Sequence, residues 1–104
     1  MDREVGRVSV ANVWVADGIA TVAVAEDVDI ATADQFRATV AAALAAYPRV
    51  VVDLTAARYF DSSGLRVLFE FADRLCEVVV PRAGLLPRVL ALVALDQVLL
   101  IRQV

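Results

Sequence analysis

A valine-rich run followed by an acidic, serine-containing turn constrains the fold of this chain most strongly. Residues 49–54 form a valine-rich run, which predicts a strand covered on both faces. After a short connection, Asp61-Ser62-Ser63-Gly64 precedes apolar residues at helical spacing. The chain therefore contains a strand–turn–helix unit, and two small hydroxyl groups stand where the helix begins.

The segments around this unit alternate between strand and helix patterns. Asp17-Gly18 separates two runs with strand character, which predicts an antiparallel hairpin of residues 7–15 and 19–25. Further on, helices are predicted over residues 33–46, from Asp61 or Ser62 onward, and over 87–94, with short strands over 76–80 and 98–101. This order predicts an α/β fold: a mixed sheet of about five strands with an N-terminal hairpin, and about three helices packed mainly on one face.

The first two helices carry more detailed signals. Thr32 and Gln35 match a capping box. Arg66, Glu70 and Arg74 are spaced four residues apart, which predicts ion pairs within the second helix. The predicted core residues are Phe36, Val40, Leu44 and Tyr47 in the first helix, and Leu65, Leu68, Phe69, Ala72 and Leu75 in the second.

Composition excludes several classes of function. The 104 residues suit a single domain, and the net charge of −3 argues against nucleic acid as a partner. The apolar run of residues 85–95 is too short to span a bilayer, and no signal peptide is evident. With Cys76 as the one cysteine, no internal disulfide forms. We therefore expect a cytoplasmic protein without membrane insertion.

Hydrophobic residues make up 61% of the chain, above the roughly 45–50% of an ordinary domain. One interpretation is a sequence rich in small side chains that packs a sheet, where Trp14 also belongs. The other is an apolar surface that docks a partner.

The serine turn has two interpretations. Ser62 can simply cap the helix through its hydroxyl oxygen. Alternatively, it accepts a phosphoryl group, which the helix dipole favours and the adjacent Asp61 opposes. No histidine is present in the chain, so the serine has no such base to activate it as a nucleophile.

The acidic loop before the first helix is also open to two interpretations. Asp27 and Asp29 are either solvated turn residues or neighbours of the serine turn, because a parallel sheet gathers such loops at one edge. The usual signatures of metal binding, disulfide exchange and phosphate-binding loops are absent from the sequence. We expect neither an enzyme nor a bound cofactor.

Taken together, these segments resemble the STAS domains, and among them the bacterial anti-sigma factor antagonists. Asp61-Ser62-Ser63-Gly64-Leu65 after a valine-rich strand resembles the family's serine motif. Glu26-Asp27-Val28-Asp29 followed by Thr32-Ala33 resembles its acidic motif. The resemblance covers nearly the whole chain and implies a single STAS domain over residues 1–104.

The resemblance implies a phosphorylation switch. In the family, the unphosphorylated antagonist binds an anti-sigma factor that is also a serine kinase using ATP and Mg²⁺, and so releases the sigma factor in a stress response. Phosphorylation of the serine after the aspartate, here Ser62, inactivates the antagonist, and a PP2C-type phosphatase reverses it. The implied flanking or partner-binding residues are Asp27, Asp29, Asp61, Ser63, Gly64, Leu65 and Arg66, with Ser63 and Gly64 shaping the turn.

The chain also departs from the family pattern. Glu26 and Arg66 each stand where the family often has glycine. The second helix or its following loop is expected to be trimmed, and the family's C-terminal helix is expected to be absent, which favours a homodimer. An alternative is therefore a STAS subunit, never phosphorylated, that braces another complex such as a lipid-transport ABC ATPase.

Overall fold

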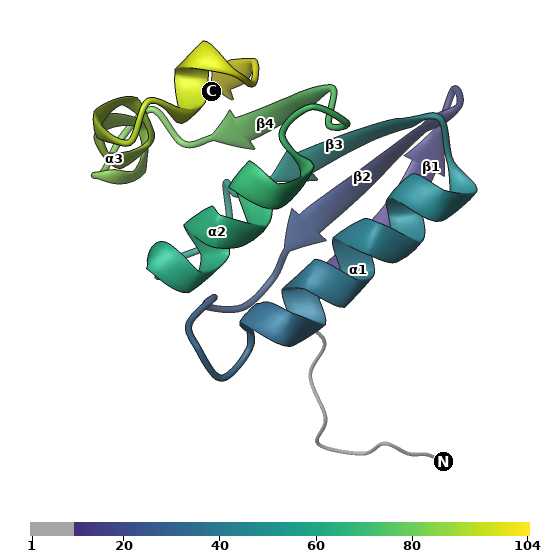
Figure 1. Ribbon diagram of the computed structural model, residues 1–104, viewed down its shortest axis with the longest axis horizontal. Helices are drawn as coiled ribbons and strands as arrows, with labels where there is room; N and C mark the ends of the chain where they lie inside the picture. Colours follow the sequence, from purple (N-terminus) through teal and green to yellow (C-terminus); the bar gives the residue numbers. More distant parts are fainter. Residues whose placement is uncertain (1–9) are drawn as a thin grey trace.

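The predicted alternation of strands and helices is present in the computed structural model, which describes residues 10–104 (Figure 1). Within these residues it has a five-stranded mixed sheet and three α-helices. The elements are β1 (Ala11–Ala16), β2 (Ile19–Val24), α1 (Ala33–Ala46), β3 (Arg49–Asp53), α2 (Ser62–Phe71), β4 (Glu77–Val80), α3 (Leu86–Leu92), a 3₁₀ helix (Leu95–Gln97) and β5 (Ile101–Gln103).

The hairpin forms at the predicted turn. Asp17 and Gly18 have φ values of 53° and 78°, as a two-residue type I′ turn requires. The register between β1 and β2 runs without interruption from Ala16↔Ile19 to Ala11↔Val24. Val10 of the predicted strand lies just before β1, and residues 7–9 of that prediction lie outside the described residues.

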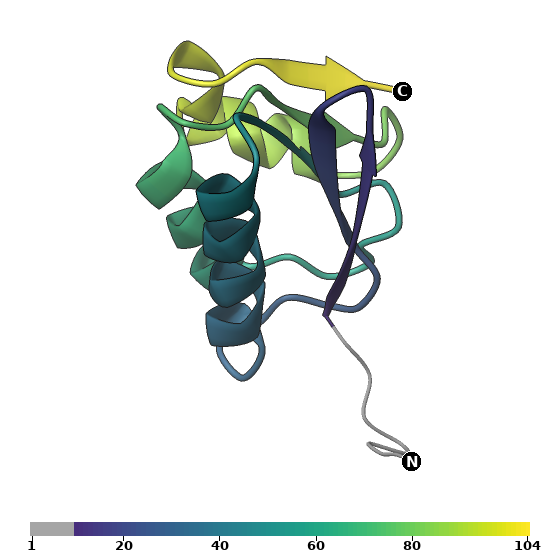
Figure 2. The same cartoon turned by 90° about the vertical axis from the view of Figure 1, so that its right-hand side faces the viewer.

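The sheet has the strand order β1-β2-β3-β4-β5, in which β1 is antiparallel to β2 and the other pairs are parallel. Because each parallel connection moves to the next strand in the same direction and crossovers are right-handed, the helices lie on one face of the sheet. Figures 1 and 2 show α1 and α2 side by side on this face. The predicted fold class is confirmed.

The hydrophobic core fills the space between the helices and the sheet. Phe36 and Val40 of α1, Leu68 of α2, and Val22 and Val52 of the central strands are fully buried. The second face of the sheet carries no helix within residues 10–104, so the expectation that both faces of β3 are covered is correct for one face only. On this open face, neighbouring strands from β1 to β4 place four residues in register, in the order Trp14, Thr21, Val51 and Glu77.

The helix bounds Ala33–Ala46 and the N-cap residue Thr32 match the prediction, but the side-chain hydrogen bonds of the capping box do not form. Thr32 makes no side-chain cap to α1, because its hydroxyl is bound within the preceding loop. The side-chain oxygen of Gln35 instead accepts a hydrogen bond from the Val10 N–H at 3.0 Å. Gln35 therefore joins α1 to the start of β1.

Two predicted core residues lie outside the core. Tyr47 follows the end of α1 and is exposed, so the buried stripe of α1 ends at Leu44 and also includes Ala43. Phe69 is 44% exposed, whereas Val67 and Phe71 are buried. The helix is thus rotated toward α1, because its inner face packs against that helix as well as against the sheet.

The C-terminal segment differs most from the prediction. The last strand is Ile101–Gln103 rather than residues 98–101, and α3 ends at Leu92 rather than at residue 94. A left-handed Ala94 (φ 63°) starts the 3₁₀ turn between them, and only Leu99 of the apolar residues 98–100 is buried. Apolar character alone therefore misplaced the strand. No helix within residues 10–104 has the length and apolar character to cross a bilayer.

Candidate functional site

The loop before α1 and the segment before α2 lie side by side at the carboxyl edge of the parallel strands. Val28 and Phe60 form an isolated parallel bridge. The Val28 N–H donates to the Tyr59 carbonyl at 2.8 Å, and the Asp61 N–H donates to the Val28 carbonyl at 3.2 Å. The acidic loop and the serine turn are therefore neighbours, as expected for loops that follow adjacent parallel strands.

Asp61, and not Ser62, is the N-cap of α2. An oxygen of its carboxylate accepts a hydrogen bond from the Ser63 N–H at 2.8 Å, and α2 begins at Ser62. Ser62 is exposed and Ser63 is half-buried. Because Asp61 makes the cap, the Ser62 hydroxyl is not needed for it.

Gly64 is required for packing and not for the conformation of the turn. A Cβ atom at this position would lie 2.6 Å from Cζ of Phe60. The Phe60 ring in turn packs edge-to-face on Phe36, with the ring centroids 5.8 Å apart. The ring thus occupies the space above the first turn of α2. We expected Gly64 to shape the turn, but its role here is to leave room for the Phe60 ring. The side chain of Leu65 is buried in the core, so only its backbone lies next to the serines.

Asp29 organises the acidic loop. Its Oδ1 accepts hydrogen bonds from the N–H groups of Ala31 and Thr32, at 2.9 and 3.2 Å. The Thr32 hydroxyl accepts from the Asp29 N–H at 3.0 Å and lies 3.0 Å from the Asp27 carbonyl. Asp27 itself is exposed. The carboxylate of Asp29 is thus engaged in local structure, and that of Asp27 faces solvent.

A groove between α1 and α2 begins at the serine turn. It has a volume of about 280 Å³, and its lining includes Ser63, Arg66, Asp34 and Ile30. Ile30 is 86% exposed at its mouth. The sequence analysis did not identify Ile30. Its signal was a lone large apolar residue in an acidic loop, outside any strand or helix pattern.

An ion pair between the two helices forms the far end of this groove. Nε of Arg37 donates to Glu70 at 2.8 and 3.0 Å, and the guanidinium lies 5.5 Å from the Phe71 ring centroid. This hydrogen bond lowers the pKa of Glu70 and raises that of Arg37. The predicted pairing of Glu70 with Arg66 and Arg74 is corrected, because Arg37 takes the carboxylate.

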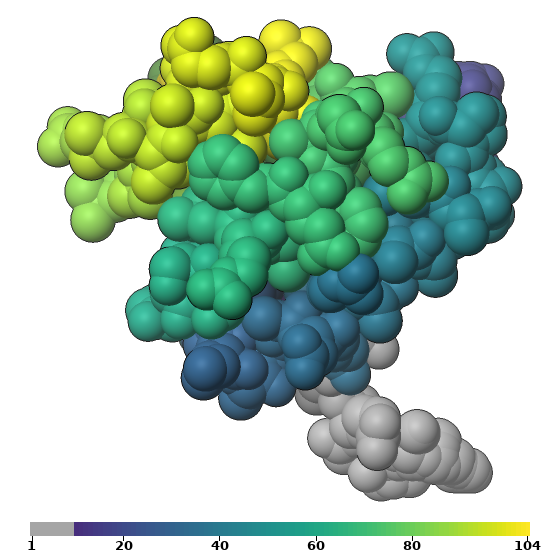
Figure 3. All heavy atoms as spheres, in the orientation of Figure 1, coloured from purple at the N-terminus to yellow at the C-terminus, as the bar shows by residue number. Residues whose placement is uncertain are grey.

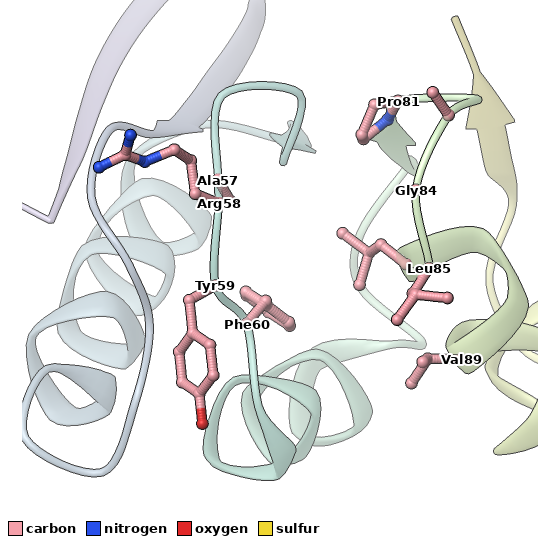
Figure 4. A pocket seen from close by; sticks show the side chains of 10 residues that line it. Ala57, Arg58, Tyr59, Phe60, Pro81, Gly84, Leu85 and Val89 are labelled. Carbon is pink, nitrogen blue, oxygen red and sulfur yellow. The ribbon is translucent and has the colours of Figure 1, made fainter.

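A second hollow lies on the other side of the segment that leads to Ser62. It has a volume of about 390 Å³ and separates residues 57–60 from the loop between β4 and α3 (Figure 4). Tyr59 and Leu85 line it and are exposed by 53% and 70%. In the space-filling view, α2 lies between the C-terminal segments and α1 (Figure 3). The serine turn therefore lies between two hollows, at whose edges Ile30, Tyr59 and Leu85 expose apolar side chains.

Residues 10–104 contain no group of three or more histidine, cysteine or acidic side chains arranged to hold a metal ion. The chemistry that the site offers is that of a hydroxyl at a helix N-terminus. Backbone N–H groups and the helix dipole favour added negative charge there.

The sequence matches the profile of the family described as "Mlab, STAS domain" over residues 15–102. The chain belongs to the STAS family. The matched range includes the acidic loop, the serine turn and the strands that position them. No curated protein matches the sequence.

Solved structures of anti-sigma factor antagonists share the fold. An anti-sigma factor antagonist from Mycobacterium paratuberculosis is 27% identical, with a TM-score of 0.77 over 88% of this chain and 83% of that one. The anti-sigma factor antagonist SpoIIAA, in its unphosphorylated form, is 13% identical with a TM-score of 0.64 over 90% of this chain and 88% of that one. The second likeness establishes the fold alone, whereas the first extends to the sequence.

Proposed function

We propose that this STAS domain is an anti-sigma factor antagonist that acts by binding a protein partner and is not an enzyme. The similarity to the mycobacterial antagonist supports this role, because it extends over 88% of the chain at 27% identity. The partner is an anti-sigma factor with serine kinase activity. Its capture by the antagonist frees a sigma factor, in the cytoplasm and without a cofactor bound to this chain.

Ser62 is the phosphoacceptor in this proposal, and one observation carries it. Ser62 is exposed at the first position of α2 while Asp61 makes the cap. Its hydroxyl is therefore accessible to a kinase, and modifying it removes no capping hydrogen bond. The added charge of about −1.5 to −2 lies beside the helix N-terminus, so the fold tolerates the phosphate.

The surface around Ser62 explains how phosphorylation would end binding. Ile30, Tyr59 and Leu85 expose apolar side chains along the two hollows beside the serine turn. A dianionic group near such a docking surface carries a large desolvation cost when a partner covers it. A PP2C-type phosphatase would restore the neutral hydroxyl and with it the binding surface.

Ser62 and Ser63 form a matched pair for the test. The protein is isolated from its native cells during growth and stress, as wild type, Ser62→Ala and Ser63→Ala, and its intact mass and peptides are analysed. We expect one phosphate on Ser62 in the wild type and in Ser63→Ala, and none in Ser62→Ala. The Ser62→Ala variant is expected to stay bound to its kinase partner.

The same experiment addresses the alternative of a STAS subunit that braces another complex, such as a lipid-transport ABC ATPase. Arg66 and the short α2 of ten residues favour this alternative. A wild-type protein that carries no phosphate under any condition, and that co-purifies with a transporter ATPase, contradicts the proposed switch.

A further inference from the structure

Among residues 10–104, no other strand pairs with the outer edge of β1. It lies at the end of the strand order, and its sequence Ala-Asn-Val-Trp-Val-Ala contains no charge and no proline. Val13, Trp14 and Val15 are exposed by 43%, 52% and 44%. Natural edge strands are usually shielded by charges, prolines, bulges or shortness. Strand β1 has none of these devices within its six uninterrupted pairs with β2.

The opposite edge of the sheet is shielded. Strand β5 has three residues, and its central Arg102 binds Glu77 of β4 with an N–O distance of 3.0 Å. The apolar character of β1 is therefore particular to one edge. A charged edge excludes another strand, whereas an uncharged edge accepts one.

The hairpin determines which backbone groups of β1 are available. In a two-residue hairpin the closing pair, here Ala16↔Ile19, is hydrogen-bonded. Hydrogen-bonded and non-hydrogen-bonded pairs then alternate along the strand. The N–H and C=O groups of Ala11, Val13 and Val15 consequently point away from β2, toward the open edge.

We infer that β1 pairs antiparallel with β1 of a second copy of this chain, about a twofold axis at Val13, and so joins two five-stranded sheets into one. In this register Val13 faces Val13 of the second copy, and Ala11 faces Val15. All the outward backbone groups of these three residues are then paired. A strand without charge also opposes no like charge when it meets itself.

Side-chain sizes fit the same register. On the open face of the sheet, Trp14 lies opposite Asn12 of the second copy, so the large ring meets a small side chain. On the helix face, Val13 borders a groove of about 440 Å³ beside α1, lined also by Ala38, Ala42 and Tyr47. Figure 2 shows the β1–β2 hairpin and α1 from this side. Val13 and Val15 of the second copy would close this groove.

The oligomeric state of the full chain tests the proposal. Sedimentation equilibrium over a range of concentrations is expected to give a monomer–dimer equilibrium. Val13→Glu places two carboxylates opposite each other, and Val13→Pro removes an outward N–H without breaking a bond to β2. Each is expected to weaken the dimer at least tenfold. Leu100→Glu, an acidic change at an exposed residue away from β1, is the matched control and is expected to dimerise normally.

Cysteine cross-linking tests the register and keeps the proposal falsifiable if Val13→Glu fails to fold. In a Cys76→Ser background, Val13→Cys is expected to form a covalent dimer on oxidation, because facing residues in a hydrogen-bonded pair have Cα atoms about 5.5 Å apart. Val15→Cys faces Ala11 and is expected not to cross-link. A monomer at every concentration, a dimer unaffected by both Val13 substitutions, or equal cross-linking at both positions would overturn the proposal.

Discussion

Single side chains position the serine turn. The Asp61 carboxylate receives the Ser63 N–H at 2.8 Å, and the Phe60 ring occupies the space that any side chain at position 64 would need. The Asp29 carboxylate holds the neighbouring loop. Asp61, Phe60 and Asp29 thus fix the local structure around the exposed Ser62.

Replacing Gly64 with alanine is expected to destabilise the fold. The new Cβ would lie 2.6 Å from Cζ of Phe60, and overpacking of this kind costs about 1–3 kcal/mol. Higher helix propensity offsets up to about 1 kcal/mol of this cost. We expect a net loss of about 1–2 kcal/mol in the free energy of unfolding, measured by urea denaturation followed by circular dichroism.

A smaller residue at position 60 provides the control. In a Phe60→Leu background the ring is gone, so Gly64→Ala is expected to be neutral or stabilising. An equal loss of stability in both backgrounds would show that the Phe60 ring is not the reason for glycine.

Two substitutions separate the structural role of Asp29 from its charge. Asp29→Ala removes the acceptor for the Ala31 and Thr32 N–H groups and is expected to cost about 1 kcal/mol. Asp29→Asn keeps an oxygen acceptor, so its stability is expected to stay within a few tenths of a kcal/mol. Partner binding is measured beside stability. If Asp29→Asn binds the partner as tightly as the wild type does, the charge has no role in recognition.

At the scale of elements, the two helices beside the serine turn are joined by Arg37 and Glu70. The guanidinium binds the carboxylate and also lies over the Phe71 ring. This contact replaces the ion pairs predicted within α2 and fixes the far end of the groove that begins at Ser63. An ion pair therefore holds α1 and α2 together in addition to apolar packing.

The Arg37–Glu70 pair is expected to contribute stability that acid removes. Its hydrogen bond lowers the pKa of Glu70 in the folded state, so the unfolded chain binds protons more readily. The contribution is present above the ordinary glutamate pKa and is lost as the pH falls through the lowered, folded-state value. Urea unfolding of wild type and Glu70→Gln at neutral and acidic pH measures it.

The difference between these two proteins is expected to shrink in acid and in high salt, because the pair is exposed to solvent. Asp73→Asn, at an exposed acidic residue of the same region, serves as the control and is expected to leave this pH dependence unchanged. A difference between wild type and Glu70→Gln that is the same at every pH would contradict an electrostatic role.

At the scale of the whole molecule, the parallel sheet brings the functional loops together. Strands β2 and β3 are parallel neighbours, so the acidic loop and the serine turn both leave the sheet at the same edge. The same topology leaves β1 as an outer strand beside α1. The proposed phosphoacceptor and the proposed dimer edge therefore occupy separate surfaces, and each can be tested without altering the other.

Much of the fold and part of the site were predictable from the sequence because their signals are local. Asp17-Gly18 specifies its own turn, the valine-rich run specifies β3, and helical spacing specifies residues 33–46. The serine turn before a helix was also recognisable. Each of these signals acts through backbone conformation or through contacts between residues close in the chain, so no knowledge of distant neighbours is required.

The sequence by itself thus determined the order of the elements, the hairpin and the place of Ser62 at a helix N-terminus. Only the tertiary structure decided that Glu70 binds Arg37, 33 residues away, that Gly64 makes room for Phe60, and that the last strand begins at Ile101. By sequence spacing, Arg66 and Arg74 were equally suitable partners for Glu70. By apolar character, residues 98–101 were equally suitable for the last strand. The contact that forms is the one that packing between distant segments brings within reach.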